Sequence, residues 1–163
     1  MMEDAPALFI AIEQSDLAAS IRQSSWAYPL ANIGHIVSLV VFAGAVSVMD
    51  LRLAGAFGAT APGPLIARAR TVAIIAFVGL LLSGLTLFAA EASHIILNPV
   101  FQIKLALIAL GLINVAVYEF ALKARIASIP AGKVMPSAVR TAGIMSLTIW
   151  IVVAALGRTI AYF

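Results

Sequence analysis

The sequence predicts an all-α membrane protein: a four-transmembrane-helix bundle preceded by an interfacial amphipathic helix. Two observations lead to this fold class. Of the 163 residues, 63% are hydrophobic and 10% are charged, and the mean hydropathy is +1.11. Soluble domains carry about a quarter charged residues. The apolar residues also gather into four stretches, each close to the roughly 20 residues that a helix needs to cross the hydrocarbon core.

The four predicted spans cover approximately residues 28–49, 71–90, 100–120 and 141–162. The connections between them are too short to form folded domains, so residues 28–163 are predicted to form one bundle. Asn98 is a suitable N-cap for the third span, with Pro99 at the first helical position.

Residues 1–27 are too polar to span and are predicted to form an outer-surface segment. Within Pro6 to Gln23, Ile10, Leu17 and Ile21 recur at helical spacing on one face, and the acidic residues are expected to face water. This pattern predicts one amphipathic helix lying on the membrane surface. The alternative is a frayed tail.

Basic residues are distributed unevenly among the three connections. Those of the first and third, with their flanks, are Arg52, Arg68, Arg70, Lys123, Arg125, Lys133 and Arg140, whereas the middle connection has none. The positive-inside rule therefore places the first and third connections in the cytoplasm and both termini on the outer side of the membrane. Topology explains the pI of about 9.7, so nucleic acid is not an expected partner.

Polar residues converge on the outer half of the predicted bundle. His35 lies in the first span, about 10 Å below the outer surface at 1.5 Å per residue. An imidazole at that depth costs free energy unless something hydrogen-bonds or coordinates it. Lys104 and Arg158 lie at similar depths in the third and fourth spans, and His94 lies at the outer mouth.

Haem b is the cofactor that this arrangement suits. It needs an imidazole ligand, apolar walls and cations for its propionates. His35 is predicted to bind the haem iron, Lys104 and Arg158 to meet the propionates, and His94 to be the sixth ligand if the second helix bends inward. The protein would then be an electron-transfer or cytochrome-like subunit of a larger membrane redox complex, with a quinone as a candidate redox partner.

Each of these residues also has a structural interpretation. The imidazole can hydrogen-bond a neighbouring helix through Ser83, Thr86 or Asn114. His94 can be a solvated loop residue, and the two deep basic side chains can extend to lipid phosphates. The protein would then be a cofactor-free membrane anchor or assembly subunit. It would pack against other membrane subunits, or a second copy of itself, through faces rich in small residues.

On the cytoplasmic side, Asp50 or Glu119 paired with Arg68, Arg70 or Arg125 predicts an ion-pair cluster that fixes helix ends. The sequence has no cysteine, no glycine-rich phosphate loop, no HExxH pair and no nucleophile elbow. These absences exclude thiolate metal sites and several common classes of catalytic centre.

Several segments together resemble a group of small uncharacterised bacterial four-helix membrane proteins, over nearly the whole chain. They are Trp26-Ala27-Tyr28-Pro29, His35, Gly44, Asp50 to Gly55, Asn98 to Leu107 and Gly157-Arg158. The order of His35, Gly44, Arg52 and Lys104-Leu105-Ala106-Leu107 is also loosely similar to that in HemJ-type protoporphyrinogen oxidases and the membrane domain of copper-resistance D proteins. In HemJ-type proteins the corresponding histidine and lysine are implicated in haem b binding, so this likeness implies haem at His35.

Overall fold

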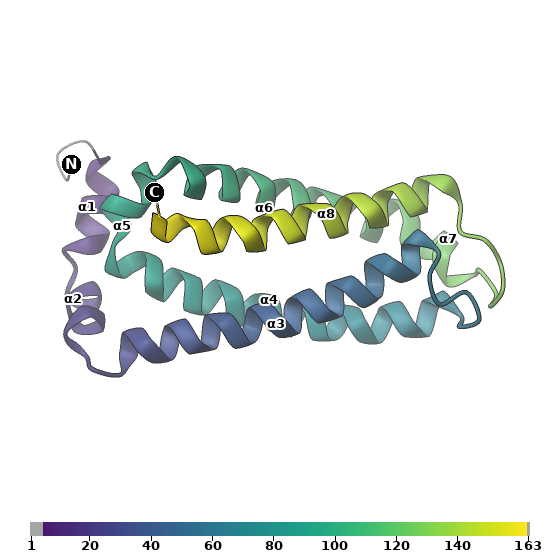
Figure 1. Ribbon diagram of the computed structural model, residues 1–163, viewed down its shortest axis with the longest axis horizontal. Coiled ribbons are helices and arrows are strands. Elements are labelled where there is room, and N and C mark those ends of the chain that lie inside the picture. Colours follow the sequence, from purple (N-terminus) through teal and green to yellow (C-terminus); the bar gives the residue numbers. More distant parts are fainter. Residues whose placement is uncertain (1–4, 163) are drawn as a thin grey trace.

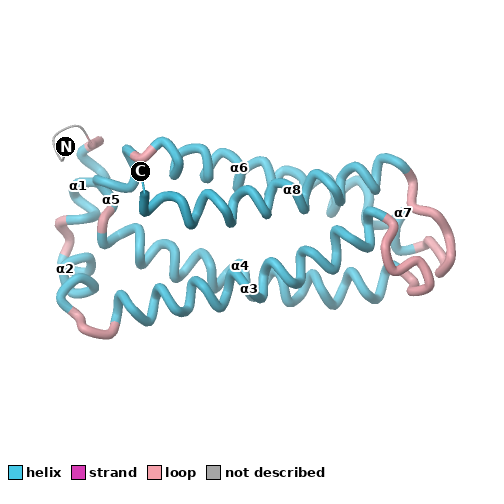
Figure 2. The backbone as a smooth tube through the Cα atoms, in the orientation of Figure 1, coloured by secondary structure: helices cyan, strands magenta, loops and turns pink. Residues whose placement is uncertain are grey.

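The computed structural model describes residues 5–162, and all of their regular structure is helical (Figures 1 and 2). The elements are α1 (Ala7–Glu13), α2 (Asp16–Gln23), α3 (Ala27–Ala54), α4 (Pro62–Ala90), α5 (Ala92–Leu97), α6 (Pro99–Val117), the π-helical segment η2 (Tyr118–Leu122), α7 (Lys123–Ala127), α8 (Ser137–Thr159) and the 3₁₀ turn η3 (Ile160–Tyr162). The predicted all-α fold class is confirmed.

Four helices are long and apolar enough to cross a membrane: Ala27–Ala54, Pro62–Ala90, Pro99–Ala127 and Ser137–Thr159. The chain is therefore a multi-pass membrane protein whose outer surface contacts the lipid bilayer. These helices extend past the predicted spans mainly at the loop-connected end, where α3 carries Arg52 near its C-terminus and α4 carries Arg68 and Arg70 in its N-terminal turns. Hydropathy detects the part of a helix that lies in hydrocarbon, and a helix continues beyond it wherever its polar side chains are solvated.

The bundle has two unlike ends (Figure 1). The terminal end carries α1, α2, α5 and η3, and the loop end carries α7 and the connections 55–61 and 128–136. Between these ends α3 packs along α4 and α8, and α6 packs along α8. All four spans therefore lie side by side, with α3 and α8 as the central pair.

The core of the bundle is an aromatic cluster shared by α3, α4 and α8. The rings of Phe42 and Trp150 meet edge to face with centroids 4.8 Å apart, and Phe77 packs against both. A Cβ atom at Gly111 of α6 would lie only 2.9 Å from Cζ2 of Trp150, so this glycine lets α6 approach α8 closely.

At the loop end, a buried arginine holds the first connection against the end of α3. Arg52 is 0% exposed, and its guanidinium donates to the carbonyl oxygens of Thr60, at 2.9 and 3.2 Å, and of Ala56, at 3.5 Å. Gly55 ends α3 with a φ of +111°, a conformation that glycine adopts without strain. The connection can therefore fold back over the end of α3, where its carbonyl oxygens accept hydrogen bonds from Arg52.

The predicted single surface helix is wrong, because the segment forms two helices, α1 and α2, separated at Gln14 and Ser15. Ser15 is the N-cap of α2: its backbone is extended, and its hydroxyl accepts from the N–H of Ala18 at 3.3 Å. Serine favours this capping position over a helix interior. Within α2, Leu17 is 67% exposed and Ile21 is buried, so the expected apolar face is only partly covered.

Candidate functional site

His35 lies on α3 in the terminal half of the bundle and is half-buried. Its Nδ1 lies 2.9 Å from Oγ of Ser83 on α4. The Ser83 hydroxyl donates to the carbonyl oxygen of Gly79 at 2.6 Å, so its proton is already used. His35 Nδ1 is thus assigned as the donor to Ser83. Ser83 is one of the three partners that the structural interpretation of His35 named, and Nε2 makes no hydrogen bond within residues 5–162.

Gly84 lies directly against the imidazole. A Cβ atom at this position would lie 3.2 Å from Cε1 of His35, closer than most real side chains tolerate. The small residue therefore provides the room in which the ring sits beside α4. Because α4 supplies both the hydrogen-bond partner and this space, it fixes the position and the tautomer of His35.

Lys104 enters the same half of the bundle from α6. Its Nζ lies 3.3 Å from the position that a Cβ of Gly157 would occupy on α8, and it is close enough to His35 for electrostatic interaction. Within the described residues Lys104 makes no hydrogen bond or ion pair. His35, Ser83, Lys104 and Gly157 come one from each span, so all four spans contribute to this region.

The other two predicted site residues lie at the surface of the terminal end. Arg158 is exposed, donates to the Tyr162 hydroxyl at 2.7 Å and stacks 4.9 Å from the centroid of that ring. His94 is exposed on α5 and lies near enough to Glu13 to contribute electrostatically to the lowered pKa of that carboxylate. Neither residue contacts His35 in the part of the chain that the structure describes.

Glu13 forms a contact that the sequence pattern did not predict, since the acidic residues of the N-terminal segment were expected to face water. Its Oε2 accepts from both the backbone N–H (2.7 Å) and the hydroxyl (2.5 Å) of Ser93 on α5. Arg22 on α2 donates to the carbonyls of Glu13 and Ala90 at 2.8 and 3.0 Å. These bonds hold α1 and α2 across the terminal end of the bundle.

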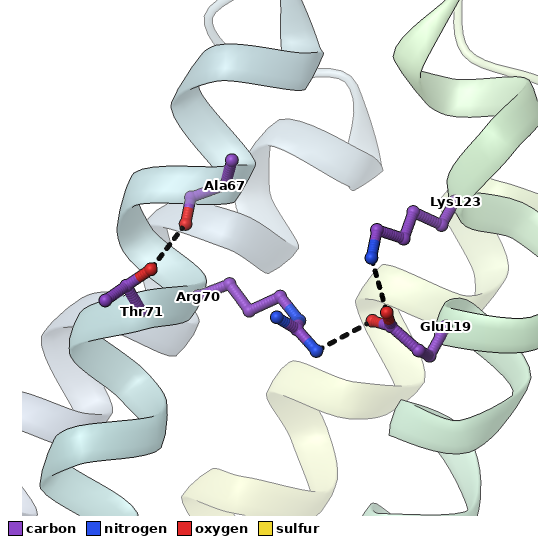
Figure 3. Close-up of polar contacts among 5 residues, drawn as sticks. All are labelled: Ala67, Arg70, Thr71, Glu119 and Lys123. Carbon is purple, nitrogen blue, oxygen red and sulfur yellow. Dashed lines mark hydrogen bonds and ion pairs between the residues drawn. The ribbon is translucent and has the colours of Figure 1, made fainter.

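A second polar site lies at the loop end, where Glu119 of η2 pairs with Arg70 of α4 at 2.9 Å and with Lys123 (Figure 3). The predicted pairing of Glu119 with Arg70 is confirmed, and Lys123 is an additional member. Asp50 is not part of this cluster. It is 4% exposed on α3, and its Oδ2 has no hydrogen-bond partner within the described residues.

The ion cluster borders a cavity of about 330 Å³ between α4 and the end of the third span. The lining residues are Gly63, Ala67, Arg70, Thr71, Tyr118, Lys123, Ile126 and Ala127. Part of this wall is the π-helical segment η2, in which the N–H of Lys123 donates to the carbonyl of Tyr118, five residues earlier. Such π-bulges are rare in helices and are often found at functional sites.

One comparison with known proteins gives a match. The model of the family of unknown function DUF6644 matches residues 25–163, which is most of the chain and includes all four spans. The chain belongs to DUF6644. A search of curated proteins and a search of solved structures each found no significant match. The DUF6644 match begins after α2, so α1, α2 and Glu13 lie outside the shared region, whereas Ser93, the partner of Glu13, lies inside it.

Proposed function

We propose that this DUF6644 protein binds haem b through Nε2 of His35 and acts as an electron-transfer or cytochrome-like subunit of a larger redox complex in a bacterial inner membrane. One observation carries the proposal: Nδ1 of His35 is committed to Ser83, which leaves Nε2 with a lone pair. A histidine ligand usually has its second nitrogen held in this way, because the bond fixes both the tautomer and the ring orientation.

The neighbouring groups fit the chemistry of haem. Lys104 comes from α6 with no partner among the described residues, so its ammonium is available to an anionic propionate. Arg158 at the end of α8 is a second cation at the same end of the bundle. When bound, haem b would supply a one-electron carrier. The residues of the chain would orient it, neutralise its propionates and exclude water with the apolar spans.

The loose resemblance to HemJ-type protoporphyrinogen oxidases supports the same assignment, since His35 and Lys104 match the histidine and lysine implicated there in haem binding. A membrane quinone is the redox partner that this proposal implies. His94 is exposed on α5, so the proposal rests on His35 alone as the iron ligand.

The test is the absorbance spectrum of the full-length protein, purified from cells supplied with haem. We expect a Soret band from the wild-type protein and its loss in His35→Ala. Ser83→Ala should lower haem affinity by at least about tenfold, because it removes the bond that orients the ligand. Thr86→Ala is the matched control, since among the described residues the Thr86 hydroxyl bonds only to the Leu82 carbonyl of its own helix. A wild-type protein without the band, or a His35→Ala variant that keeps it, contradicts the proposal.

A second candidate is a cofactor-free anchor or assembly subunit. The observation in its favour is the third span: only 6% of an apolar 18-residue stretch of this helix is buried within the chain, so the span presents a long apolar face. Small residues on the spans would allow another membrane helix to pack closely. Purification of a stable, colourless complex with a defined subunit stoichiometry would favour this function over haem binding.

A further inference from the structure

The cavity at the loop end is lined by cationic groups whose hydrogen-bond donors are mostly unused. This observation does not depend on the proposed haem site at the other end of the bundle. Arg70 and Lys123 carry two positive charges and Glu119 one negative charge, so the cluster has a net charge of +1. A guanidinium has five N–H donors and an ammonium has three. Within residues 5–162 the only partner of either cation is Glu119, reached through Nη2 of Arg70 and Nζ of Lys123. Most of their donors are therefore free.

The backbone brings these groups to one wall of the cavity. In a regular α-helix, five residues rotate by about 140° beyond one full turn, which would place Tyr118 and Lys123 on different faces. A π-helix has more residues per turn, so the same five residues return closer to one face. Both residues line the cavity as a result. Glu119 bridges the two cations, because Arg70 from α4 pairs with one of its carboxylate oxygens and Lys123 with the other (Figure 3).

The opposite part of the cavity is narrow and apolar. Gly63 and Ala67 on α4 face Ile126 and Ala127 on α7, and a Cβ at Gly63 would lie 3.6 Å from the Cα of Ala127. The site thus combines a cationic rim with a wall of small aliphatic groups. This combination suits an amphiphile, whose charged group meets the rim and whose hydrocarbon continues along the helices.

The cavity lies at the ends of two candidate membrane spans, where lipid phosphates are expected. It lies where α4 begins and where the third candidate span ends at Ala127. The side chains of Arg70 and Lys123 are 35% and 51% exposed, so a group outside the protein can reach both. Basic pockets between transmembrane helices at this depth bind anionic headgroups.

We propose that this cavity binds the phosphate group of an anionic membrane lipid, with Arg70 and Lys123 donating to the phosphate oxygens. Charge-assisted bonds from a guanidinium and an ammonium are the usual means of phosphate recognition. Glu119 keeps the two cations together and limits the charge to +1, and the acyl chains leave along the apolar surface of α4.

The experiment titrates three probes into the detergent-solubilised full-length protein and follows its thermal unfolding. The probes are short-chain phosphatidylglycerol, phosphatidylcholine of the same chain length, and inorganic phosphate. We expect a saturable rise in Tm with phosphatidylglycerol and a much smaller rise with the other two. An equal rise in Tm with inorganic phosphate would show that the site binds phosphate without the rest of the lipid, and would overturn the lipid as ligand. An equal rise with phosphatidylcholine would overturn the selectivity for an anionic headgroup.

Variants test the residues. Arg70→Gln and Lys123→Gln should each weaken the apparent affinity for phosphatidylglycerol by about tenfold, whereas Lys123→Arg should retain it. Arg68→Gln is the matched control, because Arg68 is an exposed cation on the same helix that does not line the cavity. Each response is measured against the lipid-free Tm of the same variant, so a loss of basal stability does not affect the result. If Arg68→Gln weakened the affinity for phosphatidylglycerol equally, the effect would come from general surface charge, and the proposed binding site would be overturned.

Discussion

The carboxylate of Glu13 holds the N-terminal helices on the bundle through two bonds from one residue, Ser93, which lies 80 positions later in the chain. The side-chain bond from Ser93 is the main cause that lowers the pKa of Glu13 below its ordinary value of 4.5, and the charges of Arg22 and His94 act in the same direction. A carboxylate stabilised in this way favours the docked state only while it is ionised.

This linkage predicts a pH-dependent attachment of α1 and α2. Because the pKa of Glu13 is lower when docked than when free, its contribution is complete above pH 4.5 and is lost as the pH falls through the lowered value. We expect amide hydrogen exchange in residues 7–23 to accelerate on acidification through this range in the wild-type protein. In Glu13→Gln, exchange should already be faster at neutral pH and should change less with acidification.

Asp16→Asn provides the matched control for Glu13→Gln. Asp16 is an exposed acidic residue in the first turn of α2 that makes no side-chain hydrogen bond to α5 within the described residues. Its removal should leave the pH dependence of exchange in α1 intact. The same loss in both variants would mean that general acidity of the segment, and not the Ser93 contact, holds it in place.

At the scale of the helices, small residues decide how closely neighbouring spans approach. A Cβ at Gly143 of α8 would lie 2.8 Å from the Asp50 carbonyl oxygen and from the Leu53 Cβ on α3, and one at Gly111 of α6 would lie 2.9 Å from Trp150. Gly44, in contrast, has no atom within 4 Å of such a Cβ. The first two glycines are therefore packing positions, and Gly44 faces the surroundings of the bundle.

Gly111→Ala should destabilise the protein by about 1–3 kcal/mol, because the added methyl group must displace Trp150 or separate α6 from α8. Gly44→Ala should be neutral or stabilising by up to about 1 kcal/mol, since alanine is the better helix former and meets nothing. Unfolding in detergent, followed by circular dichroism, measures both variants. The packing argument fails if the two substitutions have the same effect.

For the whole molecule, the arrangement of the spans sets the distribution of charge between its two ends. The first and last described helical elements, α1 and η3, lie at the terminal end, and the connections 55–61 and 128–136 lie at the loop end (Figure 1). The basic residues of the first and third connections and their flanks are therefore all gathered at the loop end. The positive-inside rule therefore predicts that this end faces the cytoplasm.

Reporter fusions test this orientation. A fluorescent protein that folds only in the cytoplasm should give no signal when attached after Phe163, and an alkaline phosphatase reporter at the same place should be active. Insertion of the fluorescent protein in the 128–136 connection should reverse this pattern. The opposite result at either position would invert the topology and place the proposed haem site near the cytoplasm.

The candidate site could be predicted from the sequence only in part. The depth of His35 and Lys104 in their spans follows from counting residues along the helices, and the contact of His35 with Ser83 was one of three named alternatives. The latch between Glu13 and Ser93 could not be predicted, because a water-facing and a bonded glutamate have the same helical spacing. The sequence also gives no indication of the π-helix that begins at Tyr118, since η2 contains neither proline nor glycine to mark an irregular helix.

The sequence by itself determined the membrane class, the number of spans and the position of each polar residue along its helix. These properties are local, because a helix satisfies its own backbone in lipid and hydropathy adds along the chain. Only the tertiary structure decided which polar groups meet. Which groups meet depends on how each helix is rotated and shifted against its neighbours. At Gly79, for example, a Cβ would lie 2.5 Å from Ser38 Oγ, so the glycine lets α4 approach α3 closely enough for Ser83 to reach His35. Rotation and shift follow from packing along whole interfaces.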